Sequence, residues 1–112
     1  MSTSWAVTPE KIKAAVQKIV GIERPQKIIL FGSAVQGNTD RNSDVDFLVV
    51  TSREVTSPRR ESVLIRRALR GLSMPMDILV ISERRLKELA NQPGLIYREA
   101  LRHGKVVYEA AA

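Results

Sequence analysis

The chain of 112 residues contains no cysteine and a single histidine, His103. The lack of cysteine excludes disulfides, thiolate nucleophiles and zinc held through sulfur. A lone histidine excludes a histidine-rich metal site, and His103, which precedes Gly104, is best explained as a cation near a helix C-terminus. Any metal bound by this protein must therefore be a hard ion held by carboxylates.

Long apolar runs are also missing. No segment approaches the roughly 20 apolar residues that a membrane-spanning helix needs, and the start of the chain, from Met1 to Trp5, lacks the basic-then-apolar order of a signal peptide. We therefore expect a cytoplasmic protein without a membrane partner. Apolar residues make up 44% and charged residues 27% of the chain, which is typical of a folded globular domain with one core.

Negative charge is in deficit, since 18 Lys and Arg face 12 Asp and Glu, for a formal net charge of +6. This balance suits an anionic partner such as a nucleotide, a nucleic acid or an acidic protein surface. Alternatively, the cations form the solvated faces of helices. Segments with helical periodicity contain many of them, namely Arg59, Arg60, Arg66, Arg67, Arg70, Arg84 and Arg85. The charge alone does not decide between these interpretations.

Alternating helix and strand patterns predict one α/β domain. Two helices are expected where Thr8 or Ser57, each followed by proline, forms an N-cap. Short apolar runs rich in β-branched residues predict strands buried on both faces. The domain is expected to span residues 8–109, with flexible termini at 1–7 and 110–112. Helices are predicted over residues 9–21, 58–71, 82–90 and 95–102, and strands over residues 27–31, 44–51, 76–81 and 105–108.

Three aspartates interrupt the apolar strands. Asp44 and Asp46 are two residues apart, so a strand projects both from one face, roughly 7 Å apart along the chain. Asp77 begins another apolar strand, and if the two strands are neighbours, three like charges converge and require a cation or protons between them. Oxygen ligands favour Mg²⁺. Taken singly, Asp44 and Asp77 are better explained as strand-edge residues, whereas Asp46 is hard to explain without a ligand.

A glycine and a serine, Gly32 and Ser33, follow the first predicted strand. Glycine lets the backbone approach an anion closely, and backbone N–H groups together with the serine hydroxyl can bind phosphate. On its own, such a pair is more often a simple turn, and the polar residues 34–43 indicate a loop. Ten residues separate Ser33 from Asp44, and this spacing joins a phosphate loop to a pair of metal-binding acids.

The stretch FGSAVQGNTDRNSDVDFLVV resembles the signature of the polymerase-beta-like nucleotidyltransferase superfamily, and the ending LIYREALRHGKVVYE is similar to its minimal nucleotidyltransferases. The resemblance extends from about residue 12 to residue 108. It implies an α/β (α+β) fold, a single domain with a mixed sheet of about four strands flanked by helices. It also implies that Gly32 and Ser33 hold the triphosphate, that Asp44 and Asp46 bind two Mg²⁺ ions, and that Asp77 binds the catalytic ion and helps to deprotonate the acceptor hydroxyl.

The activity that this resemblance implies is transfer of a nucleoside monophosphate, AMP from ATP, to an acceptor hydroxyl. Minimal members of this kind pair with a small helical HEPN protein in toxin–antitoxin systems, which makes this chain the expected antitoxin and a partner tyrosine a candidate acceptor. The sequence leaves homo-oligomerisation and nucleic-acid binding open, and it contains nothing that indicates the latter.

One departure from the family pattern bears on activity. Members commonly carry arginines directly after the Gly-Ser pair, where this chain has Ala34, Val35 and Gln36. Arg41 or an arginine from a partner could substitute. The departure favours an alternative, a non-catalytic module that binds a nucleotide or a partner. A further alternative, a small-molecule nucleotidyltransferase of the aminoglycoside-modifying kind, requires an additional helical domain for which this sequence is short.

Overall fold

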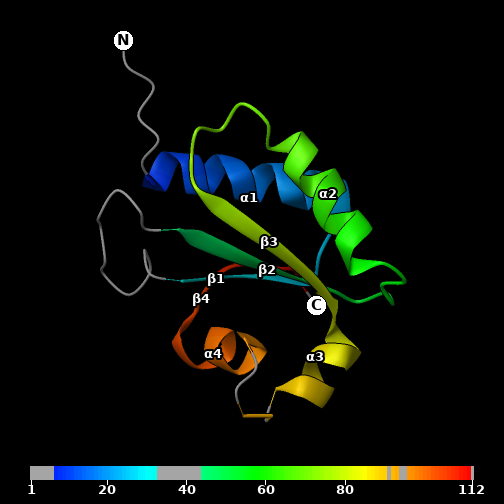
Figure 1. Ribbon diagram of the computed structural model, residues 1–112. Coiled ribbons are helices and arrows are strands. Elements are labelled where there is room, and N and C mark those ends of the chain that lie inside the picture. Colours follow the sequence, from blue (N-terminus) through cyan, green and yellow to red (C-terminus); the bar gives the residue numbers. More distant parts are fainter. Residues whose placement is uncertain (1–6, 33–43, 91, 94–95, 112) are drawn as a thin grey trace.

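A four-stranded mixed sheet forms the middle layer of the protein (Figure 1). The computed structural model describes residues 7–32, 44–90, 92–93 and 96–111. The strand order is β3-β2-β1-β4, with β1 antiparallel to both β2 and β4 and with β2 parallel to β3. The strands are β1 (Lys27–Phe31), β2 (Val45–Thr51), β3 (Met76–Ser82) and β4 (Lys105–Glu109). The predicted fold class is therefore confirmed.

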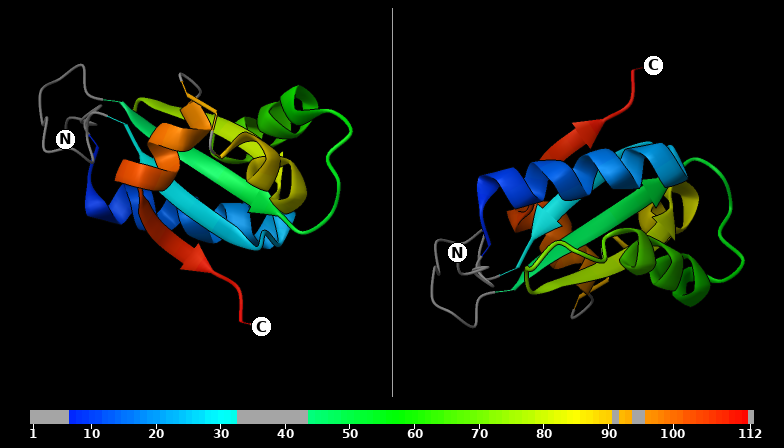
Figure 2. Two further views of the ribbon diagram at one scale, coloured as in Figure 1. Left: turned by 90° about the horizontal axis from the view of Figure 1, so that it is seen from below. Right: turned by 90° about the horizontal axis from the view of Figure 1, so that it is seen from above.

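Helices cover both faces of the sheet. The first two lie on one face and the last two on the other, so that the molecule has three layers (Figures 1 and 2). They are α1 (Pro9–Glu23), α2 (Pro58–Ala68), α3 (Glu83–Leu89) and α4 (Ile96–His103). Because β2 and β3 run parallel, the chain must cross over between them, and α2 forms that crossover.

The N-caps behave as predicted from sequence. The Thr8 hydroxyl accepts a hydrogen bond from the backbone N–H of Lys11 at 3.2 Å, and the Ser57 hydroxyl accepts one from the N–H of Arg60 at 3.3 Å. The helix ends differ slightly from prediction. α1 continues past Gly21, because the N–H of Arg24, at a φ of 49°, donates to the Val20 carbonyl and closes the helix there. α2 ends at Ala68 and is followed by a turn, whereas the sequence predicted a helix as far as Gly71.

Apolar side chains alternate between two cores along the central strands. Val45, Phe47 and Val49 of β2 pack toward α1 and α2, whereas Leu48 and Val50 pack toward α3 and α4. All five are at most 2% exposed. A strand with a core on each side must carry apolar side chains at both its odd-numbered and its even-numbered positions. This is why the apolar runs in β1 and β2 do not alternate with polar residues.

Near the chain ends, Val7 packs against the α1/α2 core and the N–H of Ala110 donates to the carbonyl oxygen of Gln26 at 2.9 Å. The domain limits at residues 8 and 109 stay predictions, and the loop predicted over residues 34–43 lies outside the described residues. Within the described ranges, no helix is both long enough and apolar enough to span a membrane.

A buried carboxylate links α1 to α2 at the carboxyl end of β2. Glu23 Oε2 contacts Arg53 Nη2 at 2.6 Å, and Arg53 Nη1 contacts Glu61 Oε1 at 3.2 Å. The Glu23 side chain is only 3% exposed, and its Oε1 has no hydrogen-bond partner among the described residues. Burial first, and the neighbouring Glu61 carboxyl second, raise the pKa of Glu23 from 4.5 to about 7.

This raised pKa makes stability depend on pH. Between pH 4.5 and 7 the folded state binds more protons at Glu23 than the unfolded state does, so the free energy of unfolding falls as the pH rises through this window. Glu23→Gln cannot titrate at this position. We therefore expect its unfolding free energy to fall by about 2 kcal/mol less than that of the wild type as the pH rises through this window. Urea unfolding at pH 5 and pH 8 measures the difference. Glu88→Gln, at an exposed position of α3, serves as the control and should keep the wild-type dependence of the unfolding free energy on pH. If Glu23→Gln also keeps that dependence, the raised pKa of Glu23 is contradicted.

Two glycines differ sharply in the room that they have. A Cβ at Gly104 would lie 2.2 Å from the Ala100 carbonyl oxygen and 2.5 Å from Ile29 Cγ2, whereas a Cβ at Gly21 would meet nothing within 4 Å. We expect Gly104→Ala to cost about 1–3 kcal/mol through overpacking. Gly21→Ala, on the exposed side of α1, should stabilise the protein by about 0.5–1 kcal/mol through helix propensity. Thermal unfolding should therefore show a lower melting temperature for Gly104→Ala and a higher one for Gly21→Ala than for the wild type.

Candidate functional site

The amino-terminal ends of β2 and β3 bring two of the predicted site residues side by side. In the parallel register of these strands, Asp46 is the Cα partner of Asp77. Side chains at partnered positions project from the same face of a sheet, here the face that also presents Leu48 and Leu79 to the α3/α4 core. Asp44 lies two residues before Asp46, immediately before β2 begins, and is exposed.

Gly32 lies directly against this pair of strands. It follows Phe31, the Cα partner of Asp46 at the end of β1. Its φ is +104°, and a Cβ there would lie 2.5 Å from Asp46 Oδ2 and 3.2 Å from the Asp44 carbonyl oxygen. Glycine is therefore required both by the backbone conformation and by the close approach of the Asp46 carboxylate.

The Asp46 carboxylate is half-buried and faces negative neighbours. Burial is the largest cause that raises its pKa from 3.8 to about 6, followed by the charges of Asp77 and then Asp44. Within the described part of the chain, no cation pairs with it. The three aspartates predicted from sequence thus interact electrostatically, with Asp46 at the centre.

Asp77 has a partner that the sequence did not reveal. Its Oδ1 accepts hydrogen bonds from the backbone N–H of Ile78, at 3.2 Å, and from Arg66 Nη2. Arg66 belongs to α2, which lies beside β3 and is tied to it by a 2.8 Å hydrogen bond from the Ser62 hydroxyl to the Ile78 carbonyl. Sequence reasoning grouped Arg66 with the solvated helix cations, because nothing in the local pattern distinguishes it from Arg67.

The donor set fits a hard divalent cation in its chemistry and only partly in its arrangement. Asp44, Asp46 and Asp77 offer oxygen ligands alone, which Mg²⁺ prefers, and no cation of the described residues pairs with Asp46. Among the described residues, however, no group of three or more acidic or histidine side chains is arranged to hold a metal ion. Arg66 engages Oδ1 of the Asp77 carboxylate and places a positive charge there, which disfavours the binding of a metal ion at the same carboxylate.

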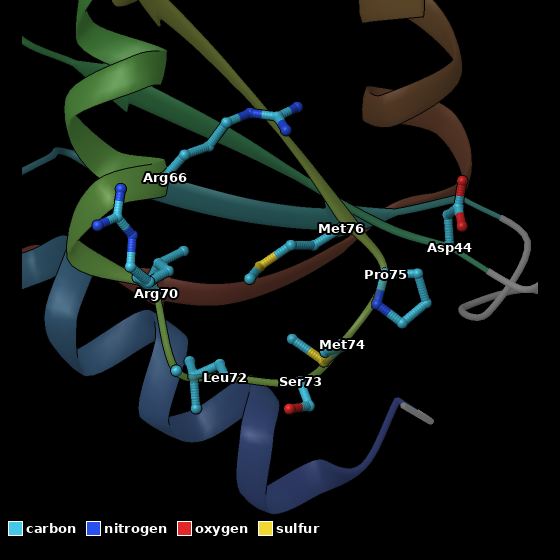
Figure 3. A pocket seen from close by; sticks show the side chains of 10 residues that line it. Asp44, Arg66, Arg70, Leu72, Ser73, Met74, Pro75 and Met76 are labelled. Carbon is cyan, nitrogen blue, oxygen red and sulfur yellow. The ribbon is translucent and has the colours of Figure 1, made fainter. Parts of the chain in front are cut away.

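A pocket opens beside these acids, between the end of α2 and the segment that leads into β3 (Figure 3). Its volume is about 500 Å³, within the range of small-ligand sites. Arg66 comes from α2 and Arg70 from the turn that follows this helix, and Asp44 lies on the opposite side of the pocket (Figure 3). Leu69, Leu72, Met74 and Met76 supply apolar lining. The pocket therefore combines two cations, one carboxylate and an apolar wall.

Other predicted residues of the phosphate loop lie outside the described residues. These are Ser33, the residues 34–36 that replace the family arginines, and the candidate substitute Arg41. Their roles stay predictions. The other arginines of α2 and of the turn after it are exposed and have no ion-pair partner in the described part of the structure, as the solvated-face interpretation expects; they are Arg59, Arg60, Arg67 and Arg70.

Comparisons with known proteins bear on the family and the fold of the chain. The sequence profile of the family described as "Polymerase beta, Nucleotidyltransferase" matches residues 10–112. Among solved structures, a candidate nucleotidyltransferase from Sulfolobus solfataricus is similar with a TM-score of 0.60 at 17% sequence identity, over 89% of this chain and 78% of that one. At this identity the structural likeness supports the fold alone. No curated protein matches the chain.

The electrostatic coupling at the site can be measured in the protein without divalent ions. Asp77→Asn removes one of the negative charges that disfavour ionisation of Asp46, so the pKa of Asp46 should fall below about 6. It should stay above 3.8, because burial is the larger cause and remains. The carboxyl ¹³C shift of Asp46 followed against pH gives the value. Glu88→Gln, on the exposed side of α3, should leave the pKa of Asp46 unchanged, and an Asp46 that titrates near 4 in the wild type would refute the coupling.

Proposed function

The chain belongs to the polymerase beta nucleotidyltransferase family, and on that premise we propose that it transfers a nucleoside monophosphate, AMP from ATP, to an acceptor hydroxyl in a magnesium-dependent reaction. The observation that carries the proposal is the in-register pairing of Asp46 with Asp77 at the start of two parallel strands. Gly32 supports it, because its lack of a side chain admits the Asp46 carboxylate to the end of β1, beside the loop to which the family resemblance assigns the triphosphate.

Each residue has a stated role in this reaction. The backbone at Gly32 and the hydroxyl of Ser33 hold the triphosphate, by resemblance to the family. Asp44 and Asp46 would hold the magnesium ions, which when bound neutralise the charge of the phosphates. Asp77, the direct neighbour of Asp46, completes the ligand set and accepts the proton of the acceptor hydroxyl.

The chemical step is an in-line displacement at the α-phosphorus. A bond forms between the acceptor oxygen and the α-phosphorus, the bond from the α-phosphorus to the bridging oxygen breaks, and pyrophosphate leaves with the electron pair. The proton of the acceptor hydroxyl passes to the Asp77 carboxylate. Positioning of the two reactants contributes most of the rate in such a transfer, so the rigid strand pair that holds Asp46 and Asp77 is suited to it.

We further propose that the acceptor belongs to a small helical HEPN-type partner, with this chain as the antitoxin of the pair. The support is the likeness of the sequence to minimal nucleotidyltransferases, together with the net charge of +6, which suits an anionic partner surface. Fold does not determine substrate, so a tyrosine hydroxyl on the partner is the first acceptor to test.

One observation favours a second function, binding without catalysis. Family members carry arginines where this chain has Ala34, Val35 and Gln36, and the loss of two phosphate-facing cations weakens the case for transfer. In this alternative the chain neutralises its partner by contact alone, and the aspartates serve nucleotide binding.

Labelled ATP distinguishes the two functions. The purified protein, with any co-purifying partner, is incubated with [α-³²P]ATP and Mg²⁺ beside an Asp44→Asn, Asp46→Asn double variant. Loss of both carboxylates should lower label transfer by on the order of 100-fold or more, because the charge of the triphosphate is then no longer neutralised.

A double variant with the same change in charge, Glu83→Gln, Glu88→Gln on α3, controls for net charge and should transfer label normally. Transfer that is equal in all three proteins would contradict the roles of Asp44 and Asp46. If none of them transfers label yet all bind the partner equally, the binding function replaces the catalytic one.

A further inference from the structure

Arg66 stands between the acidic site and the pocket. Its guanidinium binds the Asp77 carboxylate, and its side chain also lines the 500 Å³ pocket that Asp44 and Arg70 border (Figure 3). Asp77 itself does not line that pocket. The long side chain of Arg66 therefore lies within reach of both the Asp77 carboxylate and the pocket.

The contact with Asp77 conflicts with the role of Asp77 in metal binding. A guanidinium and a divalent cation compete for the same carboxylate oxygens and repel each other at short range. Arg66 Nη2 contacts Oδ1 of Asp77, so a guanidinium charge lies beside a carboxylate that the proposed function assigns to the metal. This charge opposes the binding of a cation at Asp77.

The ion pair is weak enough to exchange. The side chains of Arg66 and Asp77 are 51% and 57% exposed, respectively, and exposed ion pairs contribute little to stability. Arg66 belongs to α2 and Arg70 to the turn that follows it, and the side chains of both residues line the pocket. A phosphate group in the pocket would meet two guanidinium groups, which bind phosphate oxygens well.

We propose that Arg66 is a positioning residue that exchanges partners, from Asp77 in the free protein to a phosphate of the bound nucleoside triphosphate, so that Asp77 becomes a metal ligand only when the nucleotide is present. The proposal rests on the proposed function. It also supplies a cation, from α2, in place of those absent at residues 34–36. Nucleotide and metal then bind cooperatively, because each removes the competitor of the other.

Metal binding measures this exchange without any transfer reaction. Mn²⁺ is titrated into the protein and followed by electron paramagnetic resonance, with and without α,β-methylene-ATP, which cannot be cleaved at the α-phosphorus. In the wild type the nucleotide analogue should tighten Mn²⁺ binding. Arg66→Gln should tighten Mn²⁺ binding about 3- to 5-fold in the absence of nucleotide, since the ion no longer displaces an exposed ion pair, and the effect of the nucleotide should shrink.

Arg67→Gln is the matched control. Arg67 follows Arg66 on α2, is exposed, and has no ion pair within the described ranges, so this variant has the same change in net charge. It should bind Mn²⁺ as the wild type does. The double variant Arg66→Gln, Asp77→Asn should lose the gain, because the gain requires the Asp77 carboxylate.

The outcomes separate this inference from the proposed function. The partner exchange would be overturned if Arg66→Gln and Arg67→Gln changed the affinity for Mn²⁺ equally. It would also be overturned if the Arg66→Gln, Asp77→Asn double variant still bound Mn²⁺ more tightly than the wild type. The proposed function would still stand if Mn²⁺ binding with the nucleotide analogue is lost in Asp46→Asn. A wild type that binds no Mn²⁺ even with the analogue present would overturn both.

Discussion

The parallel pairing of β2 with β3 is the contact on which the rest of this protein depends. It sets Asp46 beside Asp77, and since parallel neighbours cannot be joined by a hairpin, it requires the crossover that α2 provides. The same crossover carries Arg66 to Asp77 and lines the pocket at the end of α2. One strand pairing thus sets the acids, the cation and the pocket together.

The acids are tolerated because they lie where the strands begin. Later positions of β2, such as Leu48 and Val50, are buried in the core between the sheet and the helices α3 and α4. A carboxylate there would have no contact with water. Asp46 is only half-buried, and its raised pKa records how much this intermediate position and its two negative neighbours disfavour the charge. A ligand that brings positive charge would favour the ionised carboxylate, which is the physical link between the fold and the proposed nucleotidyl transfer.

A second carboxylate with a raised pKa, that of Glu23, lies at the opposite end of β2. Glu23 is buried beside Arg53 and Glu61, and it joins α1 to α2 far from the aspartates. The two clusters differ in what compensates them. Glu23 has an arginine of its own, whereas Asp46 has no cation among the described residues. This contrast marks the aspartate cluster, and not the glutamate cluster, as the one arranged for a ligand.

Periodicity, capping and turn chemistry are local properties of the chain, so the residues alone predict the helices, the strands and the N-caps at Thr8 and Ser57, and they display the Gly-Ser to Asp-x-Asp spacing. The register partnership of Asp46 with Asp77 and the contact of Asp77 with Arg66 follow from the folded chain. Strand register and side-chain partners depend on packing between segments that lie far apart in sequence. Residues that look alike locally, such as Arg66 and Arg67, therefore acquire different neighbours only when the chain is folded.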